Sequence, residues 1–175
     1  MAATATEVIK EGTLAKELAG KYLTFKLGAE SYGLGILKVQ EIIGIMAITH
    51  VPRTPGFVRG VINLRGRVIP VVDLRLKFGM EGQDDTERTC VIVVQVGRSS
   101  HPLTMGIIVD EVSEVLSVEA GQIEPPPSFG TSVDTDFILG MGKVGEKVIM
   151  LLDVDRVLSG EEVALMNQSA SVLPL

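Results

Sequence analysis

The stretch Gly60-Val61-Ile62-Asn63-Leu64-Arg65-Gly66-Arg67-Val68-Ile69-Pro70-Val71-Val72 consists of two apolar runs joined by a short polar segment. Two such runs separated by a glycine-containing pair predict a β-hairpin that turns at Arg65-Gly66. Asp73 follows directly, and we expect it to cap a short helical turn from Leu74 to Phe78, because its carboxylate can accept from free backbone N–H groups. This segment therefore predicts paired strands followed by a capped turn.

Period-two patterns predict strands over most of the remaining chain. Leu23, Phe25 and Leu27 alternate with polar or half-polar neighbours, and a turn at residues 28–30 leads into a second alternating run. Further strands are expected at 36–48 with a bend at Gly44, at 89–96 and at 103–109. The sequence thus predicts an all-β fold.

The two ends of the chain are expected to lie outside this fold. Residues 1–20 are predicted to form a peripheral N-terminal tail. Ser159 and Glu162 have the spacing of a capping box ahead of an apolar run, so residues 159–175 are predicted to form a short C-terminal helix and tail.

An internal repeat is visible, because three landmarks occur twice in the same order. Val39-Gln40-Glu41-Ile42 resembles Val109-Asp110-Glu111-Val112 at an offset of 70, while Gly60 and Val71-Val72-Asp73-Leu74 align with Gly140 and Leu151-Leu152-Asp153-Val154 at an offset of 80. Chance echoes are the alternative, but the ordered agreement favours a duplication. Two copies of a short-strand unit predict two small barrels packed together, since closing a sheet removes its unpaired edges.

Composition narrows the classes of partner and compartment. The chain has 175 residues and a formal net charge of −6, so phosphate backbones repel it and no nucleic-acid partner is expected. Cys90 is the only cysteine, which excludes an internal disulfide and a cysteine-based metal cluster. The apolar runs are far shorter than the roughly 20 residues of a membrane helix, and no signal-peptide pattern is present. A cytoplasmic protein without direct membrane insertion is expected.

Motifs of catalysis are not found, so the chain is predicted not to be an enzyme. Residues 140–145 match G-x-G-x-x-G, but the segment that follows reads as a strand, whereas a dinucleotide site needs a helix there. His50 and His101 have neither metal-ligand spacing nor a neighbouring nucleophile. A carboxylate pair among Glu41, Asp73, Glu111 and Asp153 is harder to exclude, but their repeat-matched positions favour caps and strand surfaces. We predict no catalytic residue, cofactor or metal.

Basic residues gather around the hairpin. Between residues 53 and 77 the chain has six of its 16 basic residues and one acid, Asp73. One interpretation is a solvated basic face. The other is a docking surface for an acidic partner, because arginine makes bidentate contacts with carboxylates. The six are Arg53, Arg59, Arg65, Arg67, Arg75 and Lys77.

The ordered set of segments resembles the CheW family of bacterial chemotaxis coupling proteins. The resemblance rests on the run Tyr32 to Ile42, the loop Thr54 to Gly60, the hairpin with its Asp73-Leu74-Arg75 continuation, Gly106 to Val112, and Ile123 to Phe129. It covers about residues 21–169, and no single motif is diagnostic. It implies two SH3-like five-stranded β-barrel subdomains that share a hydrophobic centre, within one CheW-like domain at 21–158.

The resemblance also implies a function and contact residues. A family member is expected to be a non-catalytic adaptor that couples the cytoplasmic tips of methyl-accepting chemoreceptors to the regulatory domain of the histidine kinase CheA, in membrane-associated arrays that include other CheW-like domains. By carry-over, Val39, Glu41, Asn63 and Arg65 match receptor and coupling contacts, and Phe129 matches a contact in kinase–CheW rings.

Two alternatives stay open at this point. A barrel can hold a small molecule, although no convergent polar cluster is readable, and a CheW-like protein can serve a different pathway, such as surface motility or development. The position of Arg65 bears on its role. The hairpin is expected to align Asn63 and Arg65 with Lys143 and Val144 of the second copy, so an arginine is not needed to make the turn and a binding role is favoured.

Overall fold

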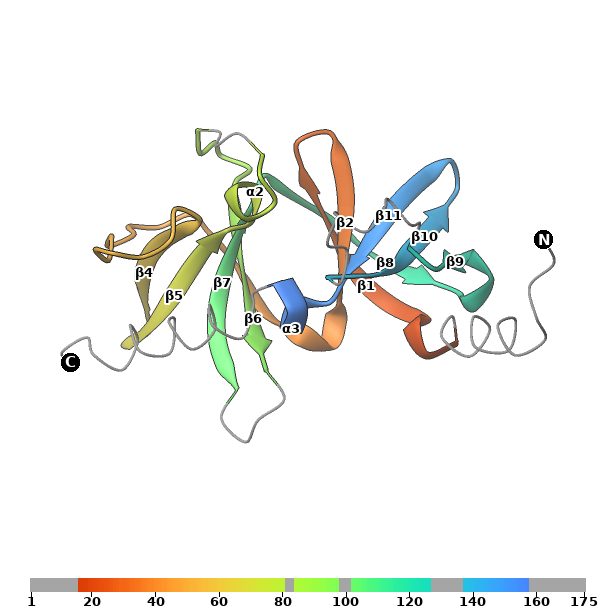
Figure 1. Cartoon of the computed structure of the whole chain (residues 1–175), viewed down its shortest axis with the longest axis horizontal. Helices are drawn as coiled ribbons and strands as arrows, with labels where there is room; N and C mark the ends of the chain where they lie inside the picture. Colours follow the sequence, from red (N-terminus) through yellow and green to blue (C-terminus); the bar gives the residue numbers. More distant parts are fainter. Residues whose placement is uncertain (1–15, 81–83, 98–101, 127–136, 158–175) are drawn as a thin grey trace.

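The computed structural model describes residues 16–80, 84–97, 102–126 and 137–157. In these ranges the strands form two sheets, in the orders β3-β6-β7-β5-β4 and β8-β1-β2-β11-β10-β9 (Figure 1). The elements are β1 Gly20–Leu27, β2 Glu30–Gly35, η1 Ile36–Lys38, β3 Val39–Gly44, β4 Val58–Leu64, β5 Arg67–Asp73, α2 Leu74–Lys77, β6 Cys90–Val96, β7 Leu103–Val109, β8 Glu111–Val118, η2 Ala120–Gln122, β9 Ile123–Glu124, β10 Ile138–Val144, β11 Lys147–Leu152 and α3 Val154–Val157.

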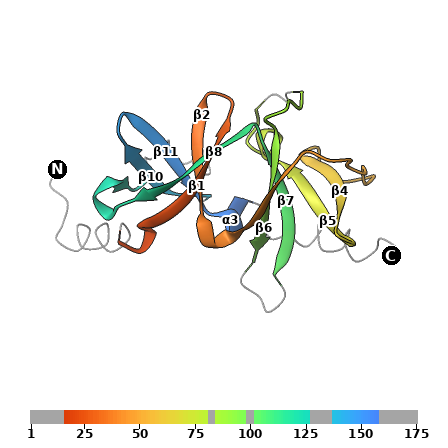
Figure 2. The same ribbon diagram turned by 180° about the vertical axis from the view of Figure 1, so that it is seen from behind.

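Each sheet takes strands from both halves of the sequence. The β1–β2 hairpin pairs with β8 and β11 of the second half, and the β6–β7 hairpin pairs with β3 and β5 of the first half. From behind, β8 runs from the region of β7 to the other sheet, and the orange segment that contains β3 crosses in the opposite direction (Figure 2). The two repeats read from the sequence are therefore interleaved, and neither repeat builds a sheet alone.

Both sheets close by a similar device. In the five-stranded sheet, Thr49 after β3 bridges Val61 of β4, and in the other sheet β9 pairs with β10 through Glu124 opposite Met141. We call these the five-stranded and the six-stranded barrel. The expectation of five strands in each barrel is wrong for the second, because the closing segment there is long enough to form the two-residue strand β9.

A glycine stands beside each closure. An ideal Cβ on Gly60 would lie 2.0 Å from the Thr49 carbonyl oxygen, and one on Gly140 would lie 2.9 Å from that of Glu124. These glycines allow the closing segment to approach the strand backbone. The sequence alignment of Gly60 with Gly140 thus has a physical cause.

The registers correct one of the proposed offsets. Val58 pairs with Val72 and Ile138 with Leu152, so the β4–β5 and β10–β11 hairpins correspond at an offset of 80. Val39 and Ile42 of β3 face Val94 and Ile92, whereas the residues of β8 that face Phe25 and Leu23 are Val112 and Val115. The β3 and β8 strands therefore correspond at an offset of 73, not 70, and the counterpart of Glu41 is Glu114.

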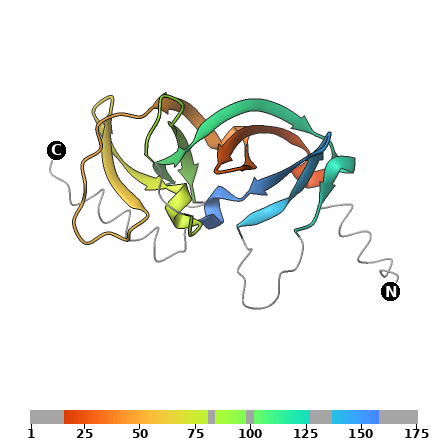
Figure 3. The ribbon, with the colours of Figure 1, turned by 90° about the horizontal axis from the view of Figure 1, so that it is seen from above.

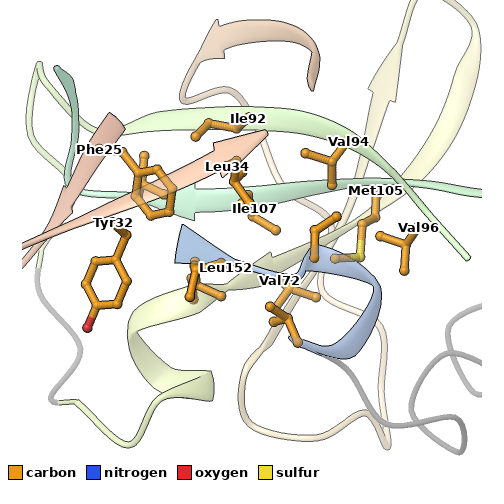
Figure 4. Close-up of a cluster of buried hydrophobic side chains, with 14 of the residues drawn as sticks. Phe25, Tyr32, Leu34, Val72, Ile92, Val94, Val96, Met105, Ile107 and Leu152 are labelled. Carbon is orange, nitrogen blue, oxygen red and sulfur yellow. The ribbon is translucent and has the colours of Figure 1, made fainter. Parts of the chain in front are cut away.

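The core has three parts. The largest cluster joins side chains of both barrels and is the shared hydrophobic centre (Figure 4). It contains Phe25 and Leu34 from one barrel and Ile92 and Ile107 from the other. Each barrel also has a smaller cluster of its own, one around Ile62 and Ile69 and the other around Ile149 and Leu151. The hairpins β1–β2 and β6–β7 are buried on both faces because they separate the central cluster from the barrel interiors.

Several local predictions are confirmed and one is refined. The Asp73 carboxylate caps α2 by accepting from the backbone N–H of Arg75 at 3.0 Å. The glycine-rich run 140–145 lies in the β10–β11 hairpin, as expected. The expected strand at 36–48 is instead the 3-10 turn η1 followed by β3, which ends at the predicted bend, Gly44. The predicted C-terminal helix at 159–175 lies outside the described residues, as do His101 and most of the N-terminal tail.

Candidate functional site

The closure of the five-stranded barrel brings two of the predicted contact residues, Glu41 and Arg65, together. Val39 and Glu41 lie on β3, and Asn63 and Arg65 lie on β4 and its turn, at opposite ends of the strand order β3-β6-β7-β5-β4. We call these four residues the coupling face. The sequence placed them in one functional group, and the structure joins two of them directly.

Arg65 and Glu41 form a bidentate ion pair across the mouth of the barrel. Nη1 of Arg65 donates to Oε1 of Glu41 at 2.9 Å, and Nη2 donates to Oε2. The hydrogen bonds and charge of Glu41 raise the pKa of the Arg65 guanidinium above its usual value. The Arg65 side chain is 73% exposed and that of Glu41 is 26% exposed, so the pair lies at the surface, where a partner can reach it.

The turn that presents Arg65 is conformationally demanding. Arg65 and Gly66 both have positive φ, 52° and 85°, as in a type I′ turn. Asn63 Oδ1 accepts from the backbone N–H of Gly66 at 2.9 Å and so stabilises the turn. An arginine in the left-handed region is unusual, because its Cβ crowds the following carbonyl. Asn63 therefore has a clear local role in shaping the hairpin, and Arg65 stands where glycine or asparagine is preferred.

The Val39 side chain is less exposed than that of Leu37. It is half-buried and packs against the shared central cluster, together with Ile36. Leu37, between them in η1, is 97% exposed. Val39 pairs with Val94 of the central cluster, whereas Glu41 pairs with Val93 of the barrel's own cluster, so the two side chains lie on opposite faces of β3. Leu37 was missed by sequence reasoning, because its place in an apolar run suggested a strand residue.

The six-stranded barrel lacks the ion pair at the corresponding place. Leu64 pairs with Arg67 and Val144 with Lys147, so the counterpart of Arg65 is Gly145, not Val144 as the sequence alignment had it. Gly145 has no side chain to reach Glu114. A cavity of about 250 Å³ lies there, lined by Glu114, Val144 and Gly145 among others. The Glu114 carboxylate makes no ion pair within the described ranges.

The basic cluster is largely neutralised by internal partners. Arg75 is 1% exposed, and its guanidinium donates hydrogen bonds to Asp73 and Asp110. These bonds raise the pKa of Arg75 above its usual value, and those to Asp73 have the largest effect. Arg59 pairs with Asp73 and Asp85, and Lys77 lies 4.6 Å from the centroid of the Phe57 ring. The expectation that all six form a basic face is wrong for Arg75, which is buried.

Phe129, the predicted ring contact, lies outside the described residues. Within the described ranges there is no group of three or more His, Cys, Asp or Glu side chains arranged to hold a metal ion. Among the helices that the structure describes, none has the length and hydropathy needed to cross a membrane.

Comparisons with known proteins show which family the chain belongs to. Residues 21–162 match the family described as the CheW-like domain. The chemotaxis protein CheW of Klebsiella aerogenes is 45% identical over 158 residues, which are 90% of this chain and 93% of that protein. The chain belongs to the CheW family.

Other CheW proteins extend the match across distant bacteria. The CheW of Bacillus subtilis is 31% identical over 142 residues, 81% of this chain and 88% of that protein. The crystal structure of the scaffolding protein TtCheW from Thermoanaerobacter tengcongensis has a TM-score of 0.73 and 35% identity, and the match covers 83% of this chain and 96% of that chain. This chain is accordingly a chemotaxis scaffolding protein of a non-catalytic family.

Proposed function

We propose that this CheW-family chain couples the cytoplasmic tips of methyl-accepting chemoreceptors to the regulatory domain of the histidine kinase CheA. The observation that carries the proposal is the Arg65–Glu41 ion pair, which joins two predicted contact residues at the surface of one barrel. Exposed Leu37 and the half-buried Val39 supply apolar surface on the segment that leads from η1 into β3. A receptor tip is a helical hairpin, and a helix can bind through an apolar stripe flanked by charges.

We further propose how the chain takes part in an array. The domain spans residues 21–158 and arose by duplication. It acts in the cytoplasm, where it is recruited to membrane receptor arrays. Phe129 serves as a contact with the kinase or with other CheW-like domains. Each such contact need be only modest, since many simultaneous contacts multiply the overall affinity.

Reconstitution tests the proposal. The purified chain, CheA and receptor-bearing vesicles are mixed, and the sedimented protein and the rate of kinase autophosphorylation are measured. We expect the chain to co-sediment with both partners and to raise kinase activity in a receptor-dependent manner. Failure of the unaltered chain to co-sediment with either partner would contradict the proposal.

A pair of variants locates the contact. Arg65→Ala is expected to fold and to abolish kinase coupling, because it removes the exposed guanidinium without touching the core. Arg67→Ala is the matched control, since Arg67 is an exposed arginine of the same hairpin that makes no ion pair within the described part of the chain. Loss of coupling in both variants would instead indicate a general effect of positive charge.

A further inference from the structure

Besides the shared hydrophobic centre, charged side chains link the two barrels at two corresponding places among the described residues. In the first, the backbone N–H of Gly28, in the β1–β2 turn, donates to Oδ2 of Asp110 at 2.6 Å, and Oδ1 of Asp110 accepts from Arg75 of α2 at 2.9 Å. Gly28 belongs to the six-stranded barrel and α2 to the five-stranded one. Asp110 lies at the junction of β7 and β8, where the chain passes between them. We call this contact the arginine clamp.

The second contact has the same parts, but here the acid is on the short helix and the cation is where the chain passes between the barrels. The backbone N–H of Gly97, just after β6, donates to Oδ1 of Asp155 at 2.9 Å, and Oδ2 of Asp155 accepts from Lys38 Nζ at 3.0 Å. Asp155 is on α3 at the position that Arg75 has on α2, 80 residues earlier. Lys38 ends η1, where the chain passes from β2 to β3. We call this contact the lysine latch. Both short helices lie between the barrels (Figure 3).

The two contacts differ in the burial of the cation and in the number of carboxylate groups that the cation binds. The Arg75 side chain is 1% exposed and is also held by both carboxylate oxygens of Asp73. The Lys38 side chain is 45% exposed and that of Asp155 is 11% exposed, and in the described part of the chain Lys38 Nζ pairs with Asp155 alone. An exposed lysine pair is screened by salt and contributes little, whereas a buried, multiply bonded arginine is not readily separated.

We propose that the lysine latch is the releasable contact between the barrels, and that it positions the coupling face. The arginine clamp keeps one side of the boundary fixed while Lys38 and Asp155 separate. Lys38 immediately precedes Val39, so the state of the latch sets how η1 and the start of β3 are held relative to α3. The positioning of the coupling face rests on the proposed function, whereas the release of the latch does not.

Distances between spin labels test the latch in the full-length chain. Labels are attached to Lys21→Cys in the six-stranded barrel and Arg67→Cys in the five-stranded barrel, both exposed, in a Cys90→Ser background. Double electron–electron resonance then reports the distribution of inter-barrel distances. We expect one narrow distribution for the parent, and a broader or second, longer distribution for Lys38→Gln and for Asp155→Asn. The parent in 1 M NaCl is expected to shift in the same direction.

The substitutions are chosen to remove charge alone. Asp155→Asn retains the oxygen that accepts from Gly97, and Asp155→Glu, which retains the charge, is expected to keep the narrow distribution. Arg156→Gln is the matched control, because Arg156 is an exposed cation of the same helix that pairs with Asp153 instead. Distributions that stay narrow in both Lys38→Gln and Asp155→Asn, with the variants folded, would overturn the latch.

Binding to a receptor-tip fragment, measured by calorimetry, tests the positioning role. Lys38→Gln and Asp155→Asn are expected to bind roughly two- to fivefold more weakly than the parent, because a less ordered coupling face loses preorganisation. Asp155→Glu is expected to bind like the parent. Equal affinities beside altered distance distributions would overturn the positioning role and leave the latch standing. If the parent itself does not bind the fragment, the proposed function fails, while the distance measurement still decides the latch.

Discussion

The two barrels share a backbone plan but differ in their charged residues at corresponding positions. The five-stranded barrel has Arg65 at the tip of its hairpin and Arg75 on the helix that follows, whereas the six-stranded barrel has Gly145 and Asp155 there. The strand registers, the closures and the capping aspartates correspond throughout. Backbone geometry therefore depends on the shared glycines, apolar residues and caps, and the functional asymmetry depends on a few side chains.

Removal of the buried arginine is expected to have the largest effect on stability. Arg75→Ala leaves Asp73 and Asp110 without their shared cation, and breaking a buried pair costs about 3–5 kcal/mol of unfolding free energy. Lys38→Ala, which removes the exposed cation of the lysine latch, is expected to cost about 1 kcal/mol or less. Urea denaturation followed by circular dichroism gives both values. Equal losses in the two variants would show that the clamp and the latch are energetically alike.

The closure glycines give the next largest effect. Gly60→Ala places a Cβ against the Thr49 carbonyl oxygen at a φ of 138°, so we expect a loss of about 3 kcal/mol. Gly140→Ala has a milder contact with the Glu124 carbonyl and no positive φ, so a loss of about 1 kcal/mol is expected. Thermal unfolding of both variants measures the difference. A larger loss for Gly140→Ala than for Gly60→Ala would mean that β9 is displaced at a greater cost than the Thr49 bridge.

The sequence predicted the strands well, because alternation of apolar side chains and the turn residues are local signals. The β4–β5 hairpin, its turn and the Asp73 cap were all predicted from neighbouring residues. The exchange of hairpins between the two halves was not predicted, because pairing between strands that are far apart in the sequence leaves no local signal. The offset of 73 between β3 and β8 was missed because Val112-Ser113-Glu114-Val115 matches Val39-Gln40-Glu41-Ile42 as well as Val109-Asp110-Glu111-Val112 does, and only the strand pairing distinguishes them.

Charge pairing was the least predictable part of the site. Glu41 and Arg65 were each selected through family resemblance, but nothing in the sequence indicated that they bond, since they are separated by 24 residues and meet only on barrel closure. Arg75 looked like part of a basic surface, because burial cannot be read from a run of cations. Its exact spacing from Asp73, two residues, is the only local signal of the pair.

The smallest effect on stability is expected at the hairpin tips, where the barrels differ most plainly. Arg65→Gly removes the ion pair to Glu41 but also relieves the positive φ of a non-glycine residue, so the two changes oppose each other. Arg65→Asn retains a residue that tolerates the left-handed region. We expect the urea midpoints of both variants to match the parent within error, while kinase coupling is lost. A clear drop in both midpoints would show that the pair with Glu41 holds the barrel closed.

The reciprocal substitution, Gly145→Arg, tests whether the six-stranded barrel can form an ion pair like that of Arg65 and Glu41. Gly145 has a φ of 63°, close to the 52° of Arg65, so Gly145→Arg can adopt the backbone that Arg65 already uses. The new side chain lies at the edge of the cavity that Glu114 lines, and Lys147 stands where Arg67 stands in the other barrel. A double-mutant cycle with Glu114→Gln measures any coupling between the two positions. Detectable coupling without gain of receptor binding would show that the ion pair alone does not make a coupling face.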